Sequence, residues 1–179
     1  GFIREVNARL QAAPQGQSHG MLFLIVHALS EVNDLAGHEL GDWAVRVTAQ
    51  MLGEQVLPGE LSGIHRSQAF LLFLPNQSEE SILERAGQLR NALERTVPFR
   101  KWEFSLQPTI GTAQYPKDGQ SAEELLNNAH FAANYASQSE NQILPFAPAQ
   151  KEQAEDTVYI RNSLRYAIES NELLLHYQP

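Results

Sequence analysis

The spacing of apolar residues changes several times along the chain, and each change predicts a switch between helix and strand. Apolar residues three or four positions apart predict helices at Phe2–Ala13, Ser30–Glu54, Ser78–Val97, Ala122–Ser137 and Asp156–Ser170. Shorter apolar runs, continuous or alternating, predict strands at Met21–Ala28, Leu61–Ile64, Ala69–Leu74, Trp102–Ala113, Gln142–Phe146 and Leu173–Tyr177. Strands that alternate with helices in this way predict an α/β or α+β sandwich.

Local signals refine these elements. Ser78 is expected to cap its helix, and the Ser121-x-x-Glu124 spacing predicts a capping box at the start of another. The helix Ser78–Val97 mixes arginine and glutamate, which predicts a solvated face with ion pairs four residues apart. The apolar pattern places five large side chains in the core, namely Trp43, Phe70, Phe104, Ile110 and Leu126.

The C-terminal part of the chain has a different composition. Ala147–Glu155 is polar and contains Pro148, so we expect a linker without a fixed fold. The helix and strand predicted after it, over 156–179, carry more apolar residues than an isolated helix should expose, so they must bury against something. The chain begins with Gly1 rather than methionine, and we expect it to be a piece of a longer protein.

Composition narrows the range of functions. The 179 residues include 13 Lys+Arg and 21 Asp+Glu, giving a net charge of −8 that disfavours nucleic acid as a partner. The absence of cysteine excludes disulfides, thiolate metal sites and thiol nucleophiles. The longest apolar run, Met21–Val26, is far shorter than the roughly 20 residues of a membrane span, and no signal peptide opens the chain. We therefore expect a cytoplasmic domain that does not itself contact a membrane.

The bare residues offer little catalytic chemistry. Among six histidines, only His27 and His65 are expected to lie close together, and two ligands make a weak metal site. Asn33 and Asp42 lie among glycines that would let a ligand approach the backbone, but a helix–loop–helix with polar caps explains them equally well. Phosphate-binding loops, zinc-protease motifs and serine-hydrolase elbows are missing from the sequence.

Two spaced motifs carry a family resemblance. Asn33–Asp42 resembles the NDxxGHxxGD segment of GGDEF domains, the diguanylate cyclases, and Pro108–Gly119 resembles their SIGIAxYPxDG strand and turn. Glu123–Ala133 is similar to the family's EELLxxADxAMY helix. The resemblance covers Phe2–Phe146, and the DxLTGLxNR motif that would precede it is absent. It implies a nucleotidyl-cyclase-like fold, with a mixed, mostly antiparallel central sheet and helices on both faces.

The end of the chain carries a second resemblance. Leu164–Pro179 resembles the opening helix and first strand of EAL domains, the cyclic-di-GMP phosphodiesterases. The segment stops before the EAL signature and its metal-binding carboxylates. This resemblance implies a degenerate GGDEF domain over 1–146, a linker over 147–155 and the start of an EAL domain over 156–179. The alternative is that the last helix and strand belong to the first domain.

The positions that bind metal in the GGDEF family are altered here. Alignment on the family motif places Ile25 at the first metal-binding carboxylate, and His27 two residues beyond it. The signature turn corresponds to Arg66, Ser67, Gln68, Ala69 and Phe70, of which only Phe70 agrees with the family, and Gln68 replaces the catalytic acid. Neither isoleucine nor a neutral amide can hold Mg²⁺ firmly or act as a general base, so we expect no metal site.

The nucleotide contacts implied by the resemblance are also depleted. Three positions that supply or neighbour the phosphate contacts carry no charge, namely Ser30, Ser137 and Asn141. The guanine contacts Asn33 and Asp42 remain, so weak binding of a guanine nucleotide is the most that we expect. The inhibitory RxxD motif, which binds the product in the family, reads Leu57 to Glu60 and lacks its arginine.

The sequence therefore predicts a catalytically inactive GGDEF domain that regulates or scaffolds an adjoining EAL domain. The fragment would not be an enzyme, while the longer protein could act as a cyclic-di-GMP phosphodiesterase, anchored to a membrane through an N-terminal sensor. A homodimer is a further expected assembly. The alternatives are a GTP-sensing module, a weak diguanylate cyclase and an RNA-turnover regulator, and the charge of −8 counts against the last.

Overall fold

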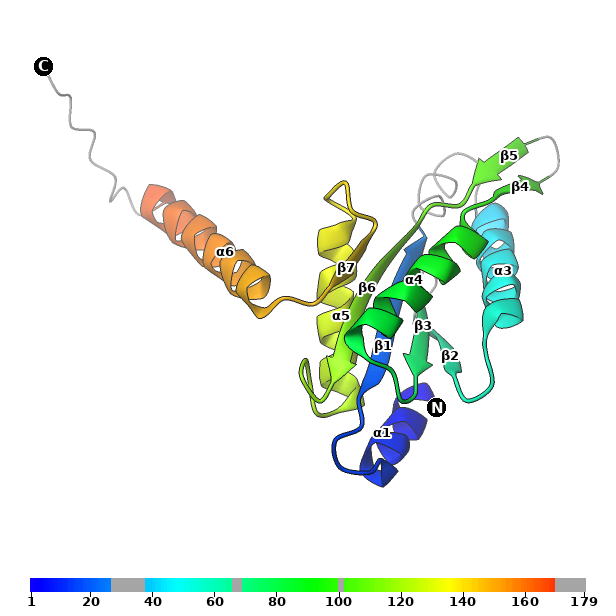
Figure 1. The fold of residues 1–179 in the computed structure, drawn as a ribbon. Helices are drawn as coiled ribbons and strands as arrows, with labels where there is room; N and C mark the ends of the chain where they lie inside the picture. Colours follow the sequence, from blue (N-terminus) through cyan, green and yellow to red (C-terminus); the bar gives the residue numbers. More distant parts are fainter. Residues whose placement is uncertain (27–37, 66–68, 100–101, 170–179) are drawn as a thin grey trace, which may run out of the picture. The chain divides into compact units, whose positions relative to one another are not determined.

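The computed structural model describes residues 1–26, 38–65, 69–99 and 102–169, which divide into two compact units at Phe146 (Figure 1). The helices are α1 (Phe2–Ala12), α3 (His38–Gln55), α4 (Glu79–Leu93), α5 (Ala122–Ala136) and α6 (Pro148–Glu169). The strands are β1 (His19–Val26), β2 (Leu61–His65), β3 (Ala69–Leu74), β4 (Thr96–Phe99), β5 (Trp102–Ser105), β6 (Pro108–Tyr115) and β7 (Ile143–Pro145). Among the described residues, no helix has both the length and the apolar character needed to cross a membrane.

The first unit, Gly1–Phe146, is built on a five-stranded sheet in the order β2-β3-β1-β6-β7. Its neighbouring strands are antiparallel except for β6 and β7, which run parallel. Strand β1 lies in the centre, where Ile25 is opposite Ala69 of β3 on one side and Thr109 of β6 on the other. The mixed, mostly antiparallel sheet predicted from the sequence is confirmed.

Helices cover both faces of this sheet (Figure 1). Leu22 and Leu24 of β1 face the core beneath α4 and α3, whereas Met21 and Phe23 face the core beneath α5 and α1. Successive side chains of a strand point to opposite faces, so a strand covered on both sides must be apolar throughout. The nearly unbroken apolar run of β1 follows from this position.

The predicted core is largely confirmed. Phe70 and Ile110 are buried beneath α4, and Trp43 packs against the same cluster while only partly buried. Leu126, a residue of α5, is partly buried and packs against the cluster on the opposite face of the sheet. The side chain of Phe104 lies outside the described residues.

The segment after α4 differs from the sequence prediction in two ways. The predicted helix Ser78–Val97 ends at Leu93, and the predicted single strand Trp102–Ala113 is divided into β5 and β6. Thr96–Phe99 instead pairs with β5 as a separate two-stranded hairpin. Thr96, Val97 and Pro98 favour an extended backbone, since β-branched residues lose rotamers in a helix and proline cannot donate there.

Both helix caps predicted from serine are present, with one difference. The Ser78 hydroxyl accepts from the Ser81 N–H, and the Ser121 hydroxyl accepts from the Glu124 N–H. The Glu124 carboxylate, however, accepts from the N–H of Gln120 at 2.7 Å, one residue before the position that a capping box predicts.

The second unit contains α6, and the expectation that Ala147–Glu155 has no fixed fold is wrong. The structure is helical from Pro148 onward, so Pro148–Glu155 has a regular conformation. Proline is well tolerated in the first turn of a helix, and the alanine, lysine, glutamine and glutamate residues that follow have high helix propensity. The predicted strand Leu173–Tyr177 lies outside the described residues.

Candidate functional site

Ile25, the residue predicted to stand at the family's first metal carboxylate, provides an apolar position in this chain. Ile25 lies near the end of β1, half-buried, and packs against the cluster beneath α5 that includes Phe23 and Leu71. Its cross-strand neighbours are Ala69 and Thr109, and Thr109 is fully buried. An aliphatic side chain has no atom that can bind a cation, so this position offers only apolar contact.

The signature turn is described only at its end. Arg66, Ser67 and Gln68 lie outside the described residues. Ala69 and Phe70, the first two residues of β3, are 9% and 1% exposed and belong to the cores on opposite faces of the sheet. Phe70, the residue that agrees with the family signature, therefore serves the packing beneath α4.

Of the two predicted guanine contacts, only Asp42 lies within the described residues. Asn33 and Ser30 lie outside the described residues, as does His27. Asp42 is exposed in the first turns of α3, and its backbone carbonyl accepts from the Arg46 Nε at 3.2 Å. The Asp42 carboxylate is thus on the surface of a helix that packs against α4.

The predicted phosphate positions Ser137 and Asn141 lie after α5, and both make local hydrogen bonds. The Ser137 hydroxyl donates to the Ala133 carbonyl of its own helix at 2.9 Å. The Asn141 carbonyl accepts from the Ser139 hydroxyl at 3.0 Å. Asn141 also lines a cavity of about 300 Å³ that Arg90 of α4 borders.

Glu60, the predicted acidic position of the inhibitory motif, forms an ion pair with Arg85 of α4. Glu60 receives two hydrogen bonds from Arg85 of α4, from Nε to Oε1 at 2.8 Å and from Nη2 to Oε2 at 2.9 Å. The Leu57 N–H also donates to Glu60 Oε2, at 2.8 Å. The Arg85 and Glu60 side chains are only 11% and 8% exposed, so water screens this pair little.

Arg85 corrects the sequence analysis. The prediction of a solvated face with pairs four residues apart holds for Arg90 and Glu94, whose side chains are 26% and 42% exposed. Arg85 instead reaches across 25 residues to Glu60 and donates to the Gln55 carbonyl at the end of α3. Arg85 lies about one turn after Ile82, beside the apolar stripe of α4, and this position in the sequence could have indicated that Arg85 is partly buried.

A second contact was also missed. His65, at the end of β2, lies beside His130 of α5 with 6.5 Å between ring centroids. The sequence predicts that His65 lies close to His27, which is outside the described residues, and predicts no role for His130. The two residues are 65 positions apart, so local spacing could not bring them together.

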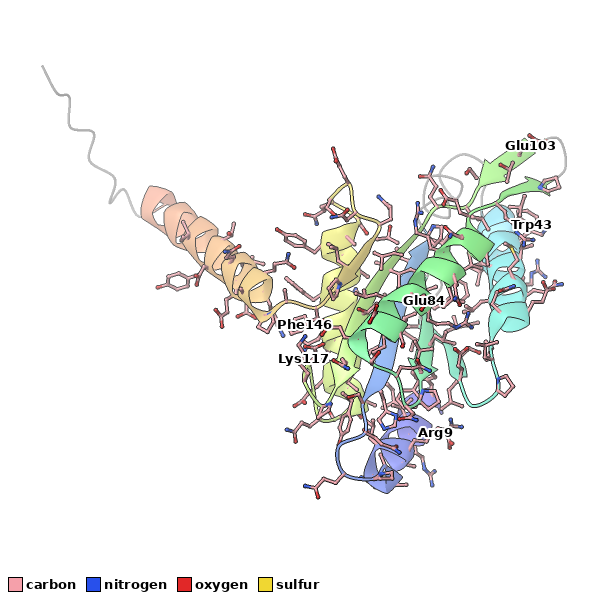
Figure 2. All side chains as sticks on the ribbon, viewed as in Figure 1. Arg9, Trp43, Glu84, Glu103, Lys117 and Phe146 are labelled. Atoms are coloured by element: carbon pink, nitrogen blue, oxygen red, sulfur yellow. The ribbon has the colours of Figure 1, made fainter. Side chains whose placement is uncertain are left out.

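Side chains of helix α1 form hydrogen bonds with the start of α5 and with the loop before β2. The Asn7 amide donates to Glu123, and its carbonyl oxygen accepts from the Ala122 N–H at the start of α5. The first of these bonds lowers the pKa of the Glu123 carboxyl. Arg9, labelled in Figure 2, donates to the Gly59 carbonyl in the loop that carries Glu60. The Glu60 loop is therefore held between α1 and α4.

The sequence matches a known family over most of its length. Residues 1–142 fit the family described as "Diguanylate cyclase, GGDEF domain". Over 170 residues the chain is 28% identical to the "Bifunctional diguanylate cyclase/cyclic di-GMP phosphodiesterase MucR" of Pseudomonas aeruginosa, which covers 94% of this chain and 25% of MucR. The chain spans about a quarter of the length of the curated relatives it matches.

Solved structures share the fold. An EAL/GGDEF domain protein from M. capsulatus is 28% identical with a TM-score of 0.69, over 79% of this chain and 94% of that one. The GGDEF domain of TpbB (YfiN) from Pseudomonas aeruginosa has a TM-score of 0.79 at 21% identity, over 86% of this chain and 92% of that one.

Proposed function

Because this chain belongs to the GGDEF domain family of cyclic-di-GMP signalling proteins, we propose that it is a catalytically silent domain that regulates or positions an adjoining EAL phosphodiesterase domain. The observation that carries the proposal is the packing of Ile25, the residue that we align with the first metal position, against the apolar cluster beneath α5. Two-metal phosphoryl transfer requires cations that neutralise the developing phosphate charge. A position without a ligand atom cannot contribute to holding them.

Loss of the phosphate contacts supports the same proposal. Ser137 and Asn141 replace cationic side chains of the family, and each lost charged contact costs roughly 1.5–3 kcal/mol. The loss of two metal-binding carboxylates and two cations would together cost about 6–12 kcal/mol of binding free energy. A micromolar dissociation constant corresponds to a total binding free energy of only about 8 kcal/mol. Ordinary GTP binding is not expected to survive losses of that size.

The Glu60–Arg85 pair bears on feedback inhibition. In the family, the acidic residue of the inhibitory motif acts beside an arginine at the position of Leu57. Here Glu60 is held in two hydrogen bonds by Arg85 and in another by the Leu57 N–H. A ligand would have to break a pair that is nearly buried, so we propose that cyclic-di-GMP does not regulate this domain through that site.

The first test is synthesis of cyclic-di-GMP from GTP by the purified chain with Mg²⁺ or Mn²⁺. We expect no product, with an active diguanylate cyclase assayed in parallel as the positive control. Product that disappears in a Gln68→Ala or His27→Ala variant would overturn the proposal, because it would mean that unusual ligands support the reaction.

GTP sensing is the second candidate, and the exposed carboxylate of Asp42 favours it, since a guanine contact of the family is retained on the surface. Calorimetry with GTP and Mg²⁺ distinguishes the two. If the domain is catalytically silent, we expect a dissociation constant for GTP no lower than about 1 mM, which corresponds to a binding free energy of about 4 kcal/mol. Micromolar binding that Asp42→Ala weakens would instead make the domain a GTP sensor.

Regulation of the EAL domain needs the longer protein. We propose that α6 is the coupling element, because Val158, Tyr159 and Ile160 are 54%, 74% and 56% exposed within the described residues. Cyclic-di-GMP hydrolysis should be compared between the longer protein and a version lacking residues 1–146. A changed rate or assembly state supports regulation or scaffolding, and identical behaviour would contradict both.

A further inference from the structure

Two histidines and a phenylalanine form a compact ring cluster on the α5 side of the sheet. His130 stacks on Phe23 of β1, with 4.5 Å between ring centroids and 25° between ring planes. His65 meets the same ring edge-on at 5.5 Å and 64°. The two imidazoles are 6.5 Å apart, and Phe23 beneath them is 2% exposed. Both imidazole rings therefore contact the ring of Phe23.

This cluster adjoins the place where the family carries its first metal carboxylate. His65 is opposite Ala69 across the β2–β3 pair, and Ala69 is opposite Ile25 across the β3–β1 pair. Residues directly opposite one another in neighbouring strands project from the same face of a sheet. His65 and Ile25 therefore lie in one cross-strand row, separated by the methyl group of Ala69, and α5 carries His130 over the same face.

We propose that His65 and His130 together bind a divalent transition-metal ion of the class that prefers imidazole, with Zn²⁺ as its representative. Imidazole nitrogen suits Zn²⁺, Ni²⁺ and Cu²⁺, whereas Mg²⁺ requires oxygen ligands. The proposed ion would use different ligands from those of the family's magnesium centre and occupy the neighbouring place. It goes beyond the silent-domain proposal and does not depend on it.

Both rings must move closer together to share one ion, because their centroids are 6.5 Å apart. Each ring contributes one nitrogen at about 2.0–2.1 Å from the ion, and its second nitrogen can keep a hydrogen bond that orients the ring. His130 is exposed, so its ring can turn away from its stack on Phe23 and bring a nitrogen toward His65. With only two imidazoles as protein ligands, two water molecules would complete a four-coordinate ion.

Binding at this site would join two elements that are distant in sequence. His65 ends the edge strand β2, and His130 lies in the middle of α5. An ion that binds the folded chain and not the unfolded one raises the unfolding temperature by mass action. The ion would connect the end of β2, which precedes the predicted signature turn, to α5.

The test uses the full 179-residue chain, with calorimetry and thermal unfolding in increasing Zn²⁺. We expect one saturable ion per chain and a rise in the unfolding temperature. The variants His65→Gln and His130→Gln should each weaken binding about ten-fold or more. His176→Gln is the matched control, the same substitution in the C-terminal segment, and should bind as the unaltered chain does.

A second measurement locates the ion. Substoichiometric Cu²⁺, which is paramagnetic, should broaden the proton resonances of His65, His130 and the Phe23 ring before those of other residues. If His65→Gln fails to fold, the exposed His130→Gln variant still decides the matter. Absence of saturable Zn²⁺ binding up to about 1 mM, or equal affinity of His130→Gln and the unaltered chain, would overturn the proposal.

Discussion

At the scale of single residues, the Glu60–Arg85 pair is the most consequential polar contact described in the first unit. It joins the loop before β2 to α4, and Arg85 also binds the last turn of α3 through the Gln55 carbonyl. Both charges are nearly removed from water, and each would be costly to leave alone. The pair therefore connects the loop before β2, the end of α3 and α4.

Removal of one charge from this pair should be strongly destabilising. We expect Glu60→Gln to lower the free energy of unfolding by about 3 kcal/mol, because the Arg85 guanidinium would stay buried without its counter-charge. The matched control is Glu94→Gln in the exposed Arg90–Glu94 pair, which should cost less than about 0.5 kcal/mol. Urea unfolding measures both, and equal losses would contradict this interpretation.

His19 should make stability depend on pH. It is 4% exposed, its Nδ1 accepts from the Asn76 N–H at 3.0 Å, and burial lowers its pKa below the ordinary 6.5. The unfolded chain therefore takes up the proton first, so the stabilisation is complete above pH 6.5 and is lost as the pH falls toward the lowered pKa.

The measurement is the free energy of unfolding against pH for the unaltered chain and for His19→Asn, whose amide oxygen can accept the same hydrogen bond. The difference between the two curves should shrink as the pH falls below 6.5. Asp118 is present in both proteins and acts in the opposite sense. Burial raises its pKa, so its contribution is lost as the pH rises. Parallel curves would exclude His19 as the source.

At the scale of elements, strand β6 and helix α5 approach each other very closely at Gly111. A side-chain carbon added at Gly111 would collide with the backbone of Ala129 and Ala133. The α5 residues facing the sheet are mostly alanine, which lets the helix backbone approach the strand. Glycine at 111 is thus required by packing, and the family's SIGIA motif has glycine at the same position.

We expect Gly111→Ala to destabilise the domain by about 3 kcal/mol or more, because neither backbone can move aside without shifting α5. Gly87→Ala in α4 is the matched control. A carbon added there meets nothing within 4 Å, and alanine is favoured in a helix, so stability should rise by about 0.5–1 kcal/mol. Chemical unfolding of both variants checks the pair, and a tolerated Gly111→Ala would mean that α5 is loosely packed.

At the scale of the whole molecule, the first unit includes its last residue in its core. Phe146 is 9% exposed, packs in the cluster beneath α5, and donates its N–H to the Thr112 carbonyl at 2.8 Å. Strand β7 just before it pairs with β6. The end of this unit is therefore determined by packing rather than by a change in composition.

Truncation should distinguish the two units. A chain of residues 1–146 is expected to unfold cooperatively within a few degrees of the full chain, and to be monomeric if α6 drives any association seen by light scattering. Truncation after residue 141 removes β7 and Phe146 and should lower the unfolding temperature markedly, since burying a phenylalanine is worth about 1.5–3 kcal/mol. Unfolding of the 1–146 chain would show that the C-terminal segment belongs to the first domain.

The sequence by itself determined most of the elements and the family of the chain. Apolar runs located β1 and the paired strands β2 and β3, and Ser78 and Ser121 located the caps of α4 and α5, because these features depend on residues close together in the chain. The motif around Pro108–Gly119 indicated the family, and Ile25 at a carboxylate position predicted the loss of a metal ligand without any coordinates. Each of these follows from residue type and local spacing alone.

Only the tertiary structure decided which distant residues meet. The sequence could not pair Arg85 with Glu60, His65 with His130, or Gly111 with α5, because each contact depends on strand register and helix packing over long separations. It also merged β5 with β6, which have similar apolar patterns but belong to different sheets. Burial then changes the chemistry, since a charge or an imidazole removed from water behaves differently from the same group on a solvated face.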